Sequence, residues 1–193
     1  MKTARSDRTR TPEEAAEAAA KIGQPVAIKA FGPDIVHKTE VGAVALGLSG
    51  PAEVAQAGRG IAERVRAAGL RLDVQEMVAG GVEMLVGVAH DPLFGPVVAV
   101  GAGGTRVELL RDVAIRLTPI SDLDANEMVR SLGTFPLLDG FRGAPKVDVS
   151  ALEEVILRVG ALADNHPAVA EMDCNPVTVL PVGAVIVDAR VRV

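Results

Sequence analysis

The sequence has very few aromatic residues: it lacks tryptophan and tyrosine, and its four phenylalanines make up 2% of the 193 residues. A core without large rings must be built from small and β-branched aliphatic side chains, and apolar residues reach 49% of the chain. That composition favours strands packed under helices. The length is typical of one domain or of two closely packed lobes.

The single cysteine, Cys174, excludes an internal disulfide, and no apolar run is long enough for a secretory segment or a membrane span. We therefore expect a protein of the reducing cytoplasm with no membrane partner. The net charge of −5 is spread along the chain without a basic stripe, which argues against a nucleic-acid partner. Basic residues gather only between Lys2 and Arg10, and we expect residues 1–10 to form a disordered arm.

Hydrophobic periodicity and capping signals predict an α+β fold. Thr11, Pro12 and Glu14 are typical of a helix start, and Gly23 of a helix end. A glycine pair at residues 80–81 separates two expected lobes, 11–78 and 79–193, of which the second has a mainly antiparallel sheet. We expect helices over 12–22, 51–68, 124–132 and 149–163, and strands over 25–31, 41–48, 72–78, 82–90, 96–101, 106–110, 114–117, 169–173 and 185–191.

Oxygen-bearing side chains gather at Glu171, Asp173 and Asn175. In an extended segment these three share one face, with neighbouring Cα atoms about 7 Å apart. Mg²⁺ prefers carboxylate and amide oxygens, so the spacing suits a nucleotide-bound metal. It equally suits an Asx-type turn at Asn175-Pro176 ahead of a hairpin. We expect Cys174 to point into the apolar layer as a small core residue.

Two further segments contain groups that bind phosphate in other proteins. Lys29 projects from the polar side of an apolar strand, where it could reach phosphate oxygens or simply remain solvated. Residues 101–105 form a glycine-rich stretch after another strand, and their bare backbone could lie close to phosphate or serve as a plain turn. This stretch is neither a Walker loop nor a dinucleotide fingerprint.

Taken in order, these segments resemble the ATP-grasp portion of NDP-forming acetyl-CoA and acyl-CoA synthetases. The resemblance runs from about residue 11 to the C-terminus, and an ordered series is more specific than any one motif. The matching segments are Pro25–Lys29, His37-Lys38-Thr39-Glu40-Val41-Gly42, Gln75-Glu76-Met77-Val78, Asp91-Pro92-Leu93-Phe94-Gly95-Pro96, Gly101-Ala102-Gly103-Gly104 and Glu171-Met172-Asp173-Cys174-Asn175-Pro176.

The resemblance implies an ATP-grasp fold with the nucleotide between two α+β lobes. It implies that Lys29 contacts the ATP phosphates, that Glu83 accepts from a ribose hydroxyl, and that Asp173 and Asn175, with Glu171, hold Mg²⁺. A surface glutamate is the alternative for Glu83. The remaining implied nucleotide contacts are Lys38, the hinge Glu76, Met77 and Val78, whose backbone meets adenine, and the backbone of Gly103 and Gly104.

Two residues are implied to take part in phosphoryl transfer. His37 lies in a loop where an imidazole could be phosphorylated, or could merely be solvated, and Arg116 could neutralise phosphate charge. In such enzymes acid, CoA and ATP are interconverted with acyl-CoA, phosphate and ADP through an acyl phosphate and a phosphohistidine. Positioning and charge neutralisation are what phosphoryl transfer chiefly needs.

The sequence departs from the family in what it lacks. It has no CoA-binding or ligase-like portion, so we expect a separate chain to supply these, in a homo- or hetero-oligomer. The usual start of the first lobe is also missing, which we expect to leave that lobe shortened. The alternatives to an ATP-binding synthetase subunit are a regulatory ATP-grasp module without turnover and a purely structural subunit. The acyl acid, and the choice between ATP and GTP, stay open.

Overall fold

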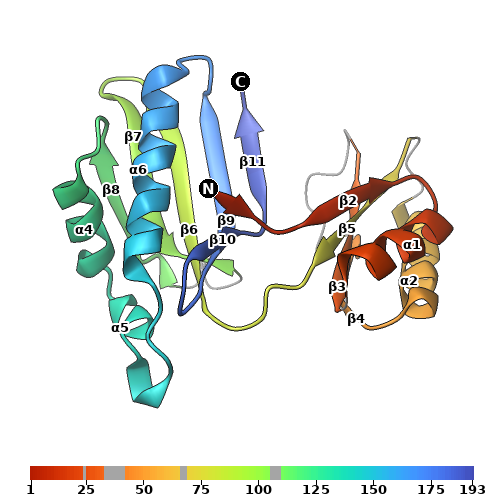
Figure 1. Cartoon of the computed structure of the whole chain (residues 1–193). Helices are drawn as coiled ribbons and strands as arrows, with labels where there is room; N and C mark the ends of the chain where they lie inside the picture. The colour runs from red at the N-terminus through yellow and green to blue at the C-terminus, as the bar shows by residue number, and fades with distance from the viewer. Residues whose placement is uncertain (24, 33–41, 66–68, 105–109) are drawn as a thin grey trace. The chain divides into compact units, whose positions relative to one another are not determined.

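The computed structural model describes residues 1–23, 25–32, 42–65, 69–104 and 110–193 (Figure 1). The chain forms two compact units. The small unit is Ala4–Val78, and the large unit is Ala79–Val193 together with Met1–Thr3. The chain therefore passes from one unit to the other at two places, after Thr3 and after Val78.

The small unit is a four-stranded antiparallel sheet with two helices. The strand order is β2-β5-β3-β4. Its elements are β2 (Ser6–Thr9), α1 (Pro12–Ile22), β3 (Val26–Phe31), β4 (Val44–Leu48), α2 (Pro51–Val65) and β5 (Arg71–Glu76). The predicted start of α1 is confirmed, because the Thr11 side chain accepts a hydrogen bond from the Glu14 N–H at 3.1 Å and Pro12 opens the helix.

Both helices of the small unit pack on the same face of its sheet. Val26, Ile28 and Ala30 alternate along β3 and are fully buried in one cluster with alanines of α1 and with Val54 and Ile61 of α2. Burial of these aliphatic side chains is the main stabilising contribution in this unit. Since side chains of a strand alternate between faces, the residues between them, Lys29 included, lie on the opposite face.

The large unit is a seven-stranded sheet of order β1-β10-β9-β6-β7-β8, with β11 also paired to β9. All its pairs are antiparallel except β1 with β10. Its elements are β1 (Lys2–Thr3), β6 (Val82–Asp91), β7 (Gly95–Ala102), β8 (Val113–Leu117), α4 (Asp122–Ser131), α5 (Phe135–Leu138), the 3₁₀ turn η2 (Phe141–Gly143), α6 (Val149–Asn165), β9 (Glu171–Val179), β10 (Ala184–Ile186) and β11 (Ala189–Arg192).

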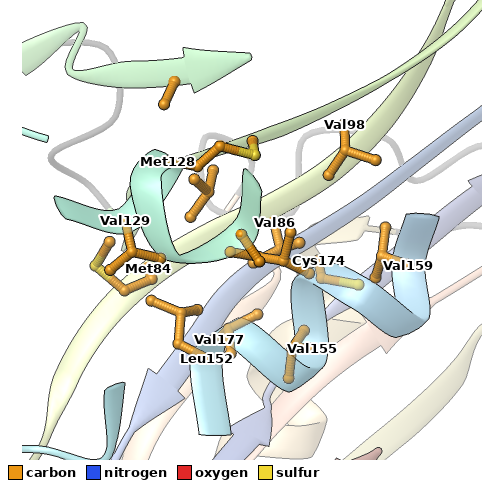
Figure 2. Close-up of a cluster of buried hydrophobic side chains, with 14 of the residues drawn as sticks. Met84, Val86, Val98, Met128, Val129, Leu152, Val155, Val159, Cys174 and Val177 are labelled. Atoms are coloured by element: carbon orange, nitrogen blue, oxygen red, sulfur yellow. The ribbon is translucent and has the colours of Figure 1, made fainter. Parts of the chain in front are cut away.

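Helices α4 and α6 cover one face of this sheet, and the main core lies beneath them (Figures 1 and 2). Cys174 is fully buried there, which confirms it as a core side chain. Burial, with the nearby charge of Asp173, raises the pKa of the Cys174 thiol to about 11, so the thiolate is scarce at neutral pH. Neighbours of Cys174 in this core include Met84, Val86, Val98, Met128, Leu152, Val155, Val159 and Val177.

The expected disordered arm over residues 1–10 is wrong. Residues 2–3 form β1 in the large sheet, and residues 6–9 form β2, which pairs antiparallel with β5 at the edge of the small sheet. An edge strand tolerates charged side chains, because only part of it faces a core. Thr9 marks the buried end of β2: its hydroxyl donates to the Leu72 carbonyl oxygen at 3.1 Å.

Two expectations at the C-terminal end also need correction. Strand β9 runs through Asn175-Pro176, where a turn was one of the two interpretations, and the expected strand over 185–191 is divided into β10 and β11. A register shift between Met84 and Val86 of β6 lets β9 accommodate the extra residue and continue. The expected strand over 106–110 lies, except for Leu110, outside the described residues. Within the described part of the chain, no helix is long and apolar enough to cross a membrane.

Thr9 provides a direct test of the β2 strand. We expect Thr9→Val to lower the free energy of unfolding by about 1 kcal/mol, because it deletes a buried hydrogen bond to the Leu72 carbonyl while keeping the side-chain shape. Denaturant unfolding of both proteins measures the difference. Thr3→Val, at an exposed position of β1, is the control and should change little. Equal stability of Thr9→Val and wild type would contradict the β2 assignment.

Candidate functional site

The polar residues of β9 project from the face of the large sheet opposite its helices. Met172 and Cys174 are buried beneath the helices, and Asp173 stands between them, directly across from Gly87 of β6. Alternation places Glu171 and Asp173 on the face opposite the helices. Asn175 follows at the bulge, where the Asn175–Pro176 peptide bond is cis.

The glycine-rich segment after β7 packs between β6 and the β9 bulge. The Gly103 N–H donates to the Glu83 carbonyl oxygen at 2.9 Å, and the Gly104 N–H donates to Oδ1 of Asn175, also at 2.9 Å. A Cβ atom on Gly103 would collide with the backbone of Met84, and one on Gly104 with the carboxylate of Glu83. Close approach of backbone to neighbouring groups therefore requires glycine here.

These hydrogen bonds bring three predicted site segments together in one unit. Glu83, Gly103-Gly104 and Asn175 are adjacent, although Gly104 and Asn175 are 71 residues apart in the chain. The carboxamide of Asn175 is thus oriented by a backbone donor and fixes the glycine-rich segment in turn. An amide oxygen has two lone pairs, so this bond leaves Asn175 able to accept one further ligand.

Asp173 lies in an unfavourable environment for its own charge. Partial burial raises the pKa of its carboxyl above the ordinary value, and the carboxylates of Glu171 and Asp188 raise it further, while Arg190 acts in the opposite direction. A bound cation would stabilise the ionised form and offset both causes. The environment of Asp173 therefore favours its neutral form, and a nearby positive charge would favour the ionised form.

Glu171 fits a metal less well than Asp173. Its carboxylate pairs with Nε of Arg192 at 3.1 Å across β9 and β11, and the side chain is half exposed. Among the described residues, no group of three or more His, Cys, Asp or Glu side chains is arranged to hold a metal ion by itself. A cation at Asp173 and Asn175 would have to take its remaining ligands from elsewhere, which suits Mg²⁺ bound to phosphates.

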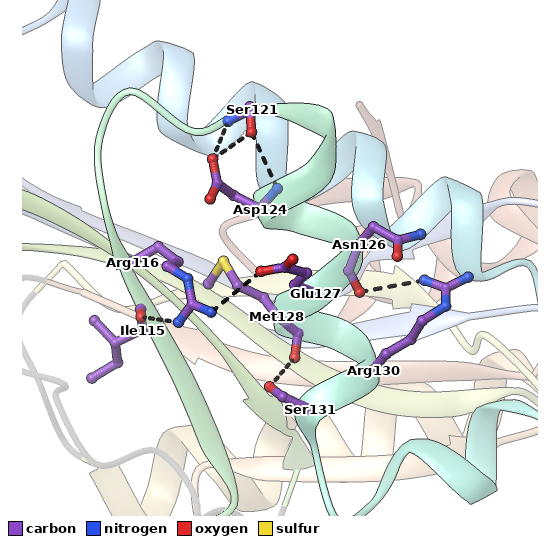
Figure 3. Close-up of polar contacts among 9 residues, drawn as sticks. All are labelled: Ile115, Arg116, Ser121, Asp124, Asn126, Glu127, Met128, Arg130 and Ser131. Atoms are coloured by element: carbon purple, nitrogen blue, oxygen red, sulfur yellow. Dashed lines mark hydrogen bonds and ion pairs between the residues drawn. The ribbon is translucent and has the colours of Figure 1, made fainter.

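Arg116 does not join these residues. It pairs in register with Val98, and its neighbour two residues earlier, Ala114, with Val100; both valines belong to the core under the helices. Arg116 accordingly lies on the helix-covered face, where its guanidinium is 3.8 Å from the carboxylate of Glu127 on α4 (Figure 3). Because Asp173 is on the other face, the expected phosphate role of Arg116 is not supported by the geometry.

In the small unit, Lys29 and the segment Glu76–Val78 are both described. Lys29 lies on the face away from α1 and α2, directly across from Asp73 of β5. The Glu76 N–H donates to the Arg5 carbonyl oxygen at 2.9 Å, and the Met77 N–H to the Pro25 carbonyl oxygen at 3.2 Å. Two of the three expected hinge donors are therefore used within the unit itself.

The Glu76 side chain has a structural contact that the motif did not reveal. Its carboxylate accepts hydrogen bonds from the backbone N–H and the Nε–H of Arg5, at 2.9 and 2.6 Å. Arg5 was expected to be disordered, and no sequence signal relates it to a residue 71 positions away. His37 and Lys38, the expected relay histidine and its neighbour, lie outside the described residues.

Comparisons with known proteins agree with this geometry. The ATP-grasp domain family matches residues 1–193. The chain is 42% identical over 186 residues to acetate–CoA ligase [ADP-forming] I of Archaeoglobus fulgidus, covering 94% of this chain and 27% of that one. It is 38% identical to the acetate–CoA ligase [ADP-forming] I subunit beta of Pyrococcus furiosus, covering 94% of this chain and 80% of that one.

Solved structures give the same result. Acetyl-coenzyme A synthetase 1 of Ca. Korarchaeum cryptofilum, in complex with coenzyme A, Ca-AMPCP and HgCl⁺, superposes with a TM-score of 0.93 and 38% identity, covering 98% of this chain and 85% of that one. A Se-Met form of the same protein, with coenzyme A and Mg-AMPPCP, superposes with a TM-score of 0.86 and 39% identity, covering 98% of this chain and 84% of that one. The expected α+β ATP-grasp fold is confirmed.

The lengths covered differ among these relatives. The chain spans about a quarter of the Archaeoglobus fulgidus ligase and four fifths of the Pyrococcus furiosus beta subunit. The match over all 193 residues, with these identities, shows that the chain belongs to the ATP-grasp domain family, in the group that forms the beta portion of ADP-forming acyl-CoA synthetases.

Proposed function

We propose that this chain binds ATP with Mg²⁺ and carries out the phosphoryl-transfer part of an ADP-forming acyl-CoA synthetase reaction, with the CoA-binding portion supplied by a partner subunit. The observation that carries the proposal is the arrangement of Asp173, Asn175, Gly104 and Glu83 on the side of the large sheet opposite its helices. Relatives named as beta subunits support a separate partner chain, and a cytoplasmic location is part of the proposal.

Asp173 and Asn175 would hold the metal. Their carboxylate and amide oxygens are the hard donors that Mg²⁺ prefers, and the raised pKa of Asp173 indicates a site that a cation would stabilise. When bound, Mg²⁺ neutralises negative charge on the phosphate oxygens. Glu171 would act at longer range through its charge, because Arg192 already pairs with its carboxylate.

The proposed contacts to phosphate and ribose involve residues of both units. Lys29 would bind phosphate from the small unit as a point charge. The N–H groups of Gly103 and Gly104 already donate to the Glu83 carbonyl and to Asn175, so these two glycines would serve the site by holding the Asn175 carboxamide in place. Glu83 would accept from the ribose.

Adenine recognition would fall on the end of β5. Because the N–H groups of Glu76 and Met77 donate within the small unit, Val78 is the hinge residue that we propose as the main backbone donor to adenine. Lys38 lies outside the described residues, and we propose it as a phosphate contact on the family resemblance alone. Arg116 has no place in this assignment because it lies on the other face of the large sheet.

His37 is the proposed phosphoryl carrier. The γ-phosphoryl group would pass from ATP to an imidazole nitrogen, ADP would leave, and the same group would then pass on toward the acyl substrate. His37→Ala should therefore abolish phosphoryl transfer in the presence of the partner subunit while leaving MgATP affinity unchanged. Radiolabelled phosphate incorporation measures transfer, and His90→Ala, at an exposed position of β6, is the control. Undiminished transfer by His37→Ala would exclude this role.

The metal assignment predicts the behaviour of Asp173→Asn in nucleotide titrations. A ligand that binds only the folded state raises apparent stability with the logarithm of its concentration over its dissociation constant. We expect MgATP to raise the melting temperature of wild type, and Asp173→Asn to weaken binding about tenfold, or ~1.4 kcal/mol. Asp164→Asn, at an exposed end of α6, is the charge-matched control. Equal Mg²⁺-dependent shifts in all three proteins would refute the assignment.

Without ligand, the same substitution should be stabilising at neutral pH. Because the folded state raises the pKa of Asp173, it binds a proton more readily than the unfolded state, so this group's contribution to stability declines as pH rises through the raised pKa. Asp173→Asn removes that loss, so its advantage over wild type should be largest near pH 7 and shrink toward pH 4. Melting temperatures measured without nucleotide or Mg²⁺ across this range test the expectation.

Asp148 serves as a comparison, because its pKa is shifted in the opposite direction to that of Asp173. Hydrogen bonds from the Ser150 side chain and the backbone of Gly183 and Ala151 lower the pKa of Asp148 at the start of α6. Asp148→Asn should therefore destabilise the protein near pH 7, and the loss should shrink on acidification. If Asp173→Asn followed the same sign as Asp148→Asn, the described environment of Asp173 would be wrong.

A further inference from the structure

Three charged residues form a row across the small sheet. Arg8 of β2 lies directly opposite Asp73 of β5, and Asp73 lies directly opposite Lys29 of β3. Side chains of directly opposed residues project from the same face, with Cβ atoms about 5 Å apart. The row therefore places one carboxylate between two cations.

The row lies on the face that α1 and α2 do not occupy. Ile28 and Val74, the neighbours of Lys29 and Asp73 along their strands, are opposed to each other and fully buried beneath both helices. Asp73 itself has a buried carboxylate oxygen, while Arg8 is exposed. The face thus combines a partly buried central carboxylate with an exposed cation.

The guanidinium of Arg8 is held in place by an aromatic ring. Its central carbon lies 3.9 Å from the centroid of the Phe31 ring, and Phe31 is two residues after Lys29 on the same face. Such stacking restricts the long arginine side chain while its N–H donors stay at the edge of the guanidinium plane. Less conformational freedom is then lost when these donors meet an anion.

The charges of this face favour an anion of more than one charge. Arg8, Lys29 and Arg71, which is opposed to Phe31, contribute three positive charges, and Asp73 contributes one negative charge. Like charges so close repel one another, and the carboxylate between Arg8 and Lys29 reduces this repulsion when no ligand is bound. A chain of phosphate groups would offer oxygens to both cations at once.

We propose that Arg8 is a second phosphate-binding cation beside Lys29, across the Asp73 position of β5, and that together they take the phosphate chain of a nucleoside triphosphate. This inference rests on the proposed function, because it extends the same nucleotide site by one residue. The guanidinium would donate to phosphate oxygens from above Phe31, while Lys29 would supply its charge from the neighbouring strand.

The test is calorimetric titration of the full chain with ATP, ADP and adenosine, each with Mg²⁺, and with inorganic tripolyphosphate. Arg8→Gln should weaken ATP and tripolyphosphate binding about five- to tenfold, weaken ADP binding less, and leave adenosine binding unchanged. Arg8→Lys, which keeps the charge but loses the planar stacked group, should recover part of the affinity. Melting temperatures of the variants show whether the fold is intact.

A matched control removes the same charge from the other face. Arg59 lies on α2, pairs with Glu13 at 3.1 Å, and is exposed, so Arg59→Gln should bind all four ligands like wild type. If Arg8→Gln weakened ATP and adenosine equally while lowering the melting temperature, Arg8 would merely hold β2 in place. That result would overturn the inference.

The two proposals fail in different ways. If wild type binds MgATP and Arg8→Gln binds it within about twofold as tightly, the role of Arg8 is overturned and the proposed function stands. If wild type binds neither MgATP nor tripolyphosphate, the nucleotide site itself is overturned, and the inference with it. Loss of ATP and tripolyphosphate affinity in Arg8→Gln, with normal stability and adenosine binding, supports both.

Discussion

The alternation of side chains across a sheet that helices cover on one face governs the placement of the candidate residues that lie in the described strands. Each unit buries aliphatic side chains under its helices, and a shift of one position would exchange the buried and uncovered sets. The register that protects the core therefore also fixes which polar groups a ligand can reach. Lys29 and Asp173 lie on the faces opposite the helices because Ile28 and Cys174 beside them are buried beneath the helices. The same alternation separates Arg116 from Asp173, since Arg116 shares the helix-covered face of its sheet with Ala114.

Alternation is local, which is why part of the site could be predicted from the sequence. The apolar residues around Lys29, and the spacing of Glu171, Asp173 and Asn175, already determine which side chains share a face, and the structure agrees. The face on which Arg116 lies could not be predicted without knowing how β8 pairs. Its apolar neighbours Ile115 and Leu117 are both exposed, so the hydrophobic alternation of the strand does not show which side is buried. The bond between Gly104 and Asn175 has no local signal at all, since it joins segments far apart in the chain.

The N-terminal residues show a different limit of sequence reasoning. Strand β2 contains Ser6, Asp7, Arg8 and Thr9, whose composition is that of a solvated arm, yet it completes the small sheet against β5. Its stability comes from backbone pairing with a strand already fixed by the core, a contribution that periodicity does not register. Two arginines of this N-terminal stretch come close to expected nucleotide contacts: Arg5 pairs with Glu76, and Arg8 lies across Asp73 from Lys29.

Stability and ligand binding make opposite demands on Asp173. A carboxylate that is partly buried near Glu171 and Asp188 costs the unliganded protein free energy, and an amide at that position would relieve the cost. Folding alone therefore gives no physical reason for an acid at this position. A cation held as proposed would reverse the balance, because its attraction to the ionised carboxylate would offset both the desolvation cost and the repulsion from Glu171 and Asp188. The proposed metal would therefore offset a local cost of the fold, which is the physical ground for proposing a nucleotide-handling role for the chain over a purely structural one.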